Sequence, residues 1–461
     1  MKNRYIYLIL FVLLFTSCIN LIPVRTRDEI KNDTETEAVI ETETNKGRAR
    51  EQRREREVIV RGKEKKETKE TKVIEPEQYS ITFVAVGDNL LHDSTQRSAL
   101  VSEGVYDFSP FYSEIKPIVE KADLAFINQE TVMAGASFGH SGYPAFNSPQ
   151  SLAIDLVNAG FDVFNLANNH AMDKGASGLY ATLDYLDTIE GITVIGARKA
   201  GESARIITIN NITLCFLSYT YGLNGISLPA NNLNLVSLII RDKMSAEIAA
   251  LRPLCDFLIV SMHWGDEYKL EPGKEQTDLA LFLAERNVDL IIGHHPHVLQ
   301  RVETITLPNG RKTLCYFSLG NFVSHQNERE RLIGGMAVLT INKKEIIPAP
   351  DDKERKPEKS ADENEMTAAG EKNDEEVFKA KKPFEISITD FGIMPLVTHY
   401  DRDLKNTKVY PLYLYTKELV ESHAIRRRDS NLTMEFFHSV SERLKTVIIM
   451  RNPFEAEEIT E

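Results

Sequence analysis

Metal-binding side chains follow five apolar, strand-like segments of the sequence, each close to the point where the segment ends. The five segments are residues 81–86, 122–127, 163–166, 257–261 and 290–292. The side chains that follow them are those of Asp88, Glu130, Asn169, His170, His263, His295 and His297. Loops at the carboxyl ends of strands in an open α/β sheet gather on one rim, where ligands bind. We therefore expect these side chains to meet in one crevice.

The mixture of carboxylate, amide and imidazole groups indicates which ions such a crevice would hold. It suits borderline divalent ions such as manganese, iron or zinc. It does not suit structural zinc, which prefers a closed, cysteine-rich tetrahedron. The candidate ligands are too many for one open catalytic ion, and they suit two divalent ions that share a bridging carboxylate. Only Pro296 separates His295 from His297, so both rings can face the same ion.

Six ordered motifs resemble those of the CapA family of capsule-biosynthesis proteins: VGDNLLH, NQET, LANNHAMDKG, HWGDEY, GHHPHVLQ and FSLGNFV. The order Asp, acidic residue, Asn-His, His and His-x-His is also similar to the metal site of calcineurin-like metallophosphoesterases. The resemblance spans about residues 80–398. It implies a metallophosphoesterase-like α/β/β/α sandwich, and a role in the synthesis and display of poly-γ-glutamate on bacterial surfaces.

The resemblance also implies a role for each site residue. Asp88, Asn169, His263, His295 and His297 would be ligands of two divalent ions, Glu130 would bridge the ions, and His170 would act beside them as general acid or would orient the leaving group. The phosphoesterase pattern has His two residues after its first Asp, where this chain has Leu90. His92 could substitute if a helix begins there.

Neighbouring residues have simpler interpretations. His294 points away or makes a supporting hydrogen bond, Asn168 forms the turn, and Asp173 either orients His170 or caps the next helix. Structural or surface roles are expected for Trp264, Glu267, Arg301 and Asn321.

Between residues 79 and 415 strand-like and helix-like segments alternate, which predicts one α/β domain with strands buried between helix layers. The segment SPQSLAIDLVNAG predicts a helix capped by Ser148 and ended by Gly160. The chain has 461 residues and a net charge of -13, which argues against a nucleic-acid partner because phosphate contacts need surplus Lys and Arg.

The N-terminus reads as a targeting segment. Lys2 and Arg4 precede an apolar run that ends just before Cys18, which resembles a lipoprotein signal over residues 1–18 with lipid carried by Cys18. The expected location is then the bacterial cell envelope, with the chain lipid-anchored to a membrane. A plain secretory signal or a retained anchor helix is the alternative.

Three further segments lie outside the α/β pattern. Residues 19–78 are a charged tether expected to be disordered, since residues 25–77 hold 15 basic and 15 acidic residues and few apolar ones. Residues 342–383 are expected to be a disordered insertion in a surface hairpin, the alternative being a linker between two domains. Residues 416–461 are expected to form a helical tail.

Two functions remain open. In the first, the protein is an envelope-tethered, metal-dependent hydrolase acting on a phosphoester or on the γ-amide of a glutamyl polymer. In the second, it is a non-catalytic accessory that binds or guides an anionic surface polymer, with capsule-synthesis membrane proteins as further partners. Nothing in the sequence names the substrate.

Overall fold

A computed structural model of the protein describes residues 76–200, 205–346, 383–444 and 446–455. The expected signal at residues 1–18, with Cys18, lies outside the described residues. Nearly all of the tether at 19–78 and of the insertion at 342–383 lie outside them as well. Within the described ranges, no helix is long and apolar enough to cross a membrane.

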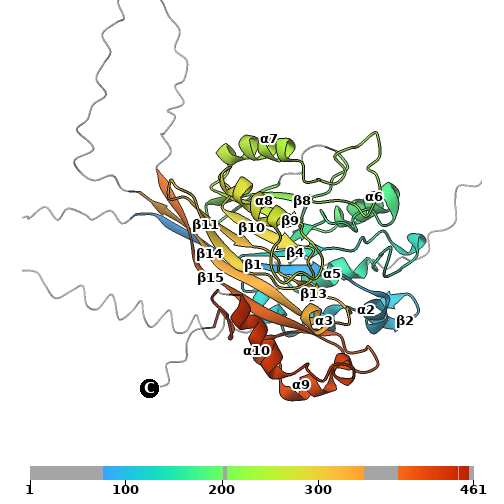
Figure 1. Cartoon of the computed structure of the whole chain (residues 1–461). Helices are drawn as coiled ribbons and strands as arrows, with labels where there is room; N and C mark the ends of the chain where they lie inside the picture. The colour runs from blue at the N-terminus through green and yellow to red at the C-terminus, as the bar shows by residue number, and fades with distance from the viewer. Residues whose placement is uncertain (1–75, 201–204, 347–382, 445, 456–461) are drawn as a thin grey trace, which may run out of the picture. The chain divides into compact units, whose positions relative to one another are not determined.

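The centre of the molecule is a pair of β-sheets (Figure 1). The eight-stranded sheet has the order β16-β15-β14-β1-β4-β5-β6, with β13 paired to β1. Its strands are β1 (Gln78–Asn89), β4 (Leu124–Gln129), β5 (Val163–Asn165), β6 (Thr193–Ile195), β13 (Asn321–Val323), β14 (Ile333–Glu345), β15 (Phe384–His399) and β16 (Lys408–Pro411). The six-stranded sheet has the order β11-β12-β10-β9-β8-β7. Its strands are β7 (Arg205–Ile209), β8 (Ile212–Thr220), β9 (Phe257–His263), β10 (Leu290–His294), β11 (Val302–Thr306) and β12 (Lys312–Tyr316).

Helices cover the outer face of each sheet. On the eight-stranded sheet these are α3 (Ser109–Tyr112), α4 (Lys116–Val119), α5 (Ser151–Asn158) and α6 (Gly175–Leu186). On the six-stranded sheet they are α7 (Arg241–Leu251) and α8 (Lys274–Ala284). A short helix, α2 (Asp93–Ser98), and the hairpin of β2 (Leu100–Ser102) and β3 (Val105–Tyr106) follow β1. This α/β/β/α order confirms the fold class expected from the sequence.

The alternation of side chains along a strand explains how one strand serves two cores. In β1, Phe83 and Ala85 point into the core between the sheets, whereas Val84 and Val86 point toward the helices. In β9, Ile259 points inward in the same way. Because both faces of these strands are buried, their sequences read as continuous apolar runs.

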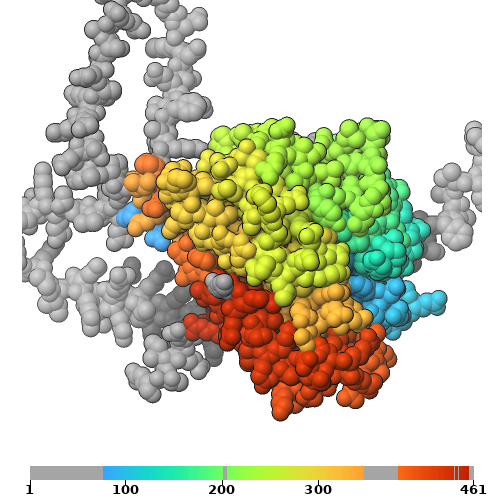
Figure 2. Space-filling model, viewed as in Figure 1, coloured from blue at the N-terminus to red at the C-terminus, as the bar shows by residue number. Residues whose placement is uncertain are grey.

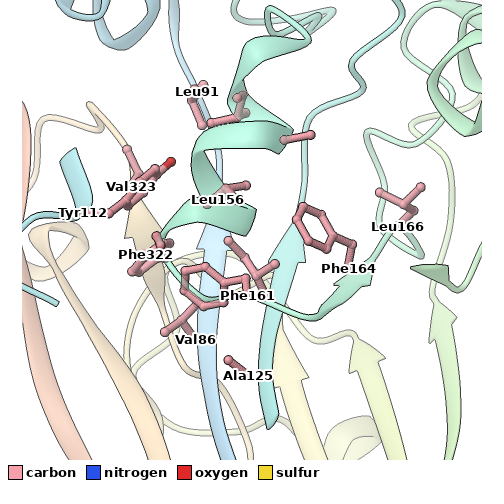
Figure 3. Close-up of a cluster of buried hydrophobic side chains, with 14 of the residues drawn as sticks. Val86, Leu91, Tyr112, Ala125, Leu156, Phe161, Phe164, Leu166, Phe322 and Val323 are labelled. Atoms are coloured by element: carbon pink, nitrogen blue, oxygen red, sulfur yellow. The ribbon is translucent and has the colours of Figure 1, made fainter. Parts of the chain in front are cut away.

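The outer core beneath α5 shows this packing in detail (Figure 3). Leu156 of α5 lies over Val86 of β1 and Ala125 of β4, and Phe161 and Phe164 complete the cluster. All five side chains are buried. This packing fixes the end of β1, from which the candidate site extends.

The predicted start of α5 is wrong, whereas its end is where the sequence puts it. The helix begins at Ser151 and not after Ser148, because the Ser148 hydroxyl lies 2.7 Å from the Thr131 hydroxyl and is used there. Gly160 follows the helix with φ of 103°, a left-handed conformation that glycine adopts without strain.

The described part of residues 416–461 packs on the body of the molecule. It contains α9 (Lys417–Ser422) and α10 (Met434–Arg443), whose Val420, Phe437 and Val440 join the core between the sheets. Figure 2 shows these C-terminal residues, in red, in continuous contact with the neighbouring surface. The strands that flank the undescribed residues 347–382 are β14 and β15. They pair antiparallel, with Glu345 opposite Phe384.

Candidate metal centre

The carboxyl ends of β1, β4, β9 and β10 bring the predicted ligands together from both sheets. Asp88 is the last residue but one of strand β1 and Glu130 follows β4, both from the eight-stranded sheet. His263 ends β9, and His295 and His297 follow β10, all from the six-stranded sheet. The site therefore lies where the two sheets meet, and neither sheet alone supplies it.

Close backbone approach shapes this rim. A Cβ atom on Gly293, just before the histidines, would overlap the backbone carbonyl of Phe317. After this point the chain turns sharply, and His295 and His297 adopt positive φ values of 96° and 57°. Non-glycine residues in this region of backbone space are strained, and such strain concentrates at functional sites.

Three groups of side chains could each hold a cation, since their ligand atoms lie within 4.8 Å of one another. They are Asp88, Glu130 and His297; Glu130, His263 and His295; and Glu267, His295 and His297. Glu130 belongs to two of these groups, which suits a carboxylate shared by two ions. Glu267, which the sequence interpretation left to solvent, is exposed and still lies within reach of two histidines.

Glu130 is the most unusual of these residues. It is completely buried, and neither carboxyl oxygen has a hydrogen-bond partner among the described residues. Its Oε1 lies 3.6 Å from His263 Nε2 and 3.9 Å from His297 Nε2. Burial, and then the charge of Asp88, raise the pKa of the Glu130 carboxyl well above its usual range. A buried carboxyl without partners is costly, and bound cations would satisfy both of its oxygens, so the residues fit a metal site.

Asp88, in contrast, is firmly held. Asn128 Nδ2 donates to its Oδ1 at 2.8 Å, the His295 backbone N–H donates to its Oδ2 at 3.2 Å, and His297 Nδ1 lies 3.1 Å from the same oxygen. Burial alone would raise the pKa of the Asp88 carboxyl, but His294 and His297 lower that pKa well below its usual range. Asp88 is therefore an ionised, oriented carboxylate.

The imidazoles are held in the form that binds metals. Burial lowers the pKa of His263 well below its usual value, and burial with the charge of His297 lowers that of His295 to about 4. Both rings are thus neutral near pH 7, as ligands must be. His263 Nε2 lies 2.8 Å from Asn169 Oδ1, and the Nδ1 atoms of His263 and His295 have no hydrogen-bond partner among the described residues.

The turn after β5 separates the roles of its two asparagines. Asn168 Nδ2 donates to the Gln129 carbonyl at 2.9 Å, and Asn168 Oδ1 accepts from the His170 N–H at 3.0 Å, so Asn168 shapes the turn. Asn169 points to His263 instead. The His170 Nδ1 lies 2.7 Å from Asp173 Oδ2, which also accepts from the Phe146 N–H at 2.7 Å. Asp173 thereby orients the His170 ring.

Besides His170, two histidines near the centre are not among the three ligand groups. His92 Nδ1 bonds the Leu90 carbonyl at 3.1 Å, and its ring packs against Phe146. His294 is completely buried and stacks on Phe126, with its Nδ1 3.5 Å from Asp88 Oδ1. His294 thus lies close to Asp88, and neither of its ring nitrogens has a hydrogen-bond partner among the described residues, whereas His92 lies beside the centre.

Sequence reasoning missed two supporting amides. Asn321, at the start of β13, places its Oδ1 3.0 Å from His297 Nδ1, so it is more than a structural turn. Asn224 Oδ1 accepts from Asn169 Nδ2 at 3.2 Å. Asn321 had a signal in SLGNF, a polar residue soon after another apolar run, whereas Asn224 lies in a loop with no such pattern. Trp264 packs in the outer core of the six-stranded sheet, as expected.

Comparison with known proteins identifies the family. A family model described as "Bacterial capsule synthesis protein PGA_cap" matches residues 82–326, more than half of the chain. The chain belongs to this family. The CapA resemblance read from the six motifs is thereby confirmed, and the matched residues contain all the candidate ligands.

Curated relatives agree with this PGA_cap assignment. The chain is 33% identical over 177 residues to the "PGA biosynthesis protein CapA" of Bacillus subtilis (strain 168), covering 37% of this chain and 44% of that protein. It is 30% identical over 178 residues to the "Capsule biosynthesis protein CapA" of Bacillus anthracis, covering 37% and 42%. The match thus spans less than half the length of these relatives.

Solved structures include the NAD nucleotidase of Haemophilus influenzae, with 13% identity and a TM-score of 0.33 over 58% of this chain and 53% of that one. With so low a TM-score, this likeness carries no argument about activity.

Proposed function

We propose that this PGA_cap protein is a metal-dependent hydrolase of capsule synthesis with two divalent ions at the rim shared by its two sheets. The observation that carries the proposal is the state of Glu130. This completely buried carboxyl lacks a hydrogen-bond partner among the described residues and belongs to two groups of candidate ligands at once. A carboxylate that bridges two cations accounts for both properties.

The ligand assignment follows from the two groups that share Glu130. Asp88, Glu130 and His297 would hold one ion, and Glu130, His263 and His295 would hold the other, with the Asn169 amide oxygen beside it. Oxygen and imidazole ligands in this mixture suit manganese, iron or zinc. When bound, such ions would lower the pKa of a water molecule and stabilise negative charge on a phosphoryl or carbonyl oxygen.

His170 is the proposed general acid, which protonates the leaving group. Because Asp173 accepts a hydrogen bond from His170 Nδ1, that nitrogen keeps its proton, and the imidazolium form of the ring carries a second, transferable proton at Nε2. In the proposed reaction His170 Nε2 donates this proton to the leaving group. The neighbouring Phe146 ring packs edge-on against the imidazole and limits its rotation.

The substrate class we propose is a phosphoester, or an amide of an anionic polymer such as a γ-glutamyl chain. The family description and the printed names of the Bacillus relatives support this choice. The proposed site of action is the bacterial cell envelope, with lipid on Cys18 and the charged residues 19–78 between the anchor and the domain. Capsule-synthesis membrane proteins are the proposed partners. Fatty-acid labelling of the wild type, lost in Cys18→Ala, tests the anchor.

Turnover of a generic phosphodiester by the purified protein, loaded in turn with manganese, iron and zinc, tests the proposed function. We expect hydrolysis that disappears in His295→Ala, whose fold is checked by circular dichroism. The same assay on a γ-glutamyl peptide tests the amide alternative. Absence of turnover of both substrates with every ion would favour the non-catalytic accessory that binds an anionic polymer.

A further inference from the structure

A single arginine beside the metal centre has a guanidinium without a counter-charge. Arg331 lies in a short 3-10 helix, Arg329–Leu332, that leads directly into β14. Its guanidinium lies 3.5 Å from the centroid of the Tyr268 ring, which it faces. No carboxylate among the described residues forms an ion pair with it. An aromatic face holds the plane of a guanidinium and leaves its N–H edges able to bind an anion.

The neighbouring arginines differ in this respect. Arg329, two residues earlier, makes ion pairs with Asp429 at 3.1 Å and with Glu330 at 3.2 Å. Arg301, which follows the histidine turn, pairs with Glu303 at 3.1 Å and with Glu271 at 3.5 Å. Both are engaged by carboxylates of the chain itself. Unlike these two arginines, Arg331 has no carboxylate partner among the described residues, and its N–H edges are available to a ligand.

Two contacts tie Arg331 to the candidate ligand His297. Tyr268, the residue under the guanidinium, has its ring centroid 6.0 Å from that of His297, and its N–H donates to the Pro296 carbonyl at 2.8 Å. Asn321, whose Oδ1 lies 3.0 Å from His297 Nδ1, donates through Nδ2 to the Arg331 carbonyl at 3.0 Å. Asn321 thus holds the backbone of Arg331 near His297, and Tyr268 holds its side chain there.

We propose that Arg331 is the specificity-determining residue of this site and binds an oxyanion of the substrate, carboxylate or phosphate, next to the scissile bond. The inference rests on the proposed hydrolase function for its placement beside the reacting bond. Arginine suits the task because its planar fork matches both oxyanions with paired hydrogen bonds. The exposed Glu267 lies at the same rim, and Arg331 offers an anionic substrate a positive contact there besides the proposed ions.

The substrate class then narrows to molecules with an acidic group besides the bond that is cleaved. A γ-glutamyl chain has one free carboxylate beside every amide, and a nucleotide or polyol phosphate chain has a second phosphate beside every ester. A neutral ester or peptide lacks this group, and Arg331 would give it no advantage.

Binding of two small anions to the metal-loaded protein, measured by titration calorimetry, tests the proposal. The probes are inorganic phosphate and the dipeptide γ-glutamyl-glutamate, and the variants are Arg331→Met and Arg331→Lys. Arg329→Met is the matched control, because it removes an arginine of the same short helix that is already paired with Asp429. Thermal unfolding of each variant checks that the fold is retained.

We expect Arg331→Met to weaken binding of at least one probe tenfold or more, Arg331→Lys to weaken it less, and Arg329→Met to leave it unchanged. Binding by the wild type should also weaken as salt is raised. Tighter binding of inorganic phosphate would indicate a phosphate group of the substrate as the oxyanion, and tighter binding of γ-glutamyl-glutamate would indicate a carboxylate. Equal binding by the wild type and Arg331→Met, or no binding of either probe by the wild type, would overturn the proposal. Because the readout is binding, failure of turnover with Arg331-dependent binding intact would contradict only the hydrolase.

Discussion

Side chains at the rim divide into candidate metal ligands and residues that hold these ligands in place. The candidate ligands could be predicted from the sequence, because acidic, amide and imidazole residues directly after apolar strands have few structural roles there. Asp173 was also predicted as a supporting residue, but Asn224 was not, because it contacts Asn169 across 55 positions of the chain and no local sequence pattern indicates such a contact. Arg331 was missed for the same reason, because its place on Tyr268 is a tertiary contact.

Asn321 gives a direct test of such a supporting contact. Replacing it by Ala removes the oxygen near His297 Nδ1, so the ring should lose its fixed orientation. Loss of a supporting hydrogen bond of this kind weakens metal affinity about 10- to 100-fold. Chelator competition would measure the change, with Asn342→Ala on the β14–β15 hairpin as a control expected to bind metal normally.

His170 should affect proton transfer and not metal binding. We expect His170→Gln to reduce turnover by about 10²- to 10⁴-fold for a phosphodiester with an alkoxide leaving group. The loss should be much smaller when the leaving group is p-nitrophenolate, which needs no proton. Asp173→Asn should follow the same pattern more weakly. An equal loss on both substrates, or loss of bound metal, would argue against a general acid at this position.

Secondary-structure elements were predicted well where burial dictates the pattern and poorly where a distant partner intervenes. The five strands that precede the site were all identified, because strands covered on both faces read as apolar runs. The cap of α5 was misplaced, because Thr131, remote in sequence, binds the Ser148 hydroxyl. The way α9 and α10 join the core between the sheets was likewise not predictable, since their apolar side chains pack in one cluster with residues of distant strands such as β15.

The segment after α9 carries a pH dependence that the structure makes testable. His423 is buried, its Nε2–H donates to the Thr398 carbonyl of β15 at 3.2 Å, and its Nδ1 accepts from the Ile425 N–H at 3.1 Å. The bond accepted at Nδ1 requires the neutral ring, because protonation of this nitrogen removes the acceptor. Burial lowers the pKa of His423 from 6.5 to about 4 in the folded state.

This lowered pKa decides whether stability rises or falls with pH. The unfolded chain binds the proton first, so the stability contributed by neutral His423 is complete above pH 6.5 and is lost as the pH falls toward 4. We expect the free energy of unfolding to fall by about 1.4 kcal/mol per pH unit for this histidine across that window. Urea unfolding at several pH values should show a flatter slope in His423→Gln. His438→Gln, on the exposed face of α10, should keep the wild-type slope.

The molecule as a whole makes its site from two sheets, and the core between them sets the distance between the two halves of the ligand set. The four-layer fold was predictable from the alternation of strands and helices together with the family motifs. The relative placement of the sheets that brings His297 near Asp88 was not predictable, because it depends on how the two sheets pack against each other.

Loosening that shared core should therefore affect the metal as well as the fold. Phe216→Ala, in the core between the sheets, should cost about 3–5 kcal/mol of unfolding free energy and also weaken metal affinity. Ile248→Ala, on the buried face of α7 in the outer core, should cost about 2–5 kcal/mol of unfolding free energy and leave metal affinity nearly unchanged. Denaturant unfolding and metal titration on both variants measure the two effects. Equal metal affinity in the two variants would show that the inter-sheet packing does not hold the ligands in place.

The most direct test of the metal centre is the metal content of the purified protein after reconstitution with manganese, iron or zinc, measured by elemental mass spectrometry. We expect two divalent ions per chain in the wild type. Glu130→Gln, which removes the shared carboxylate but keeps its shape, should lose at least one of them. A wild type that retains no manganese, iron or zinc, or a Glu130→Gln variant that holds the full complement, would contradict the account.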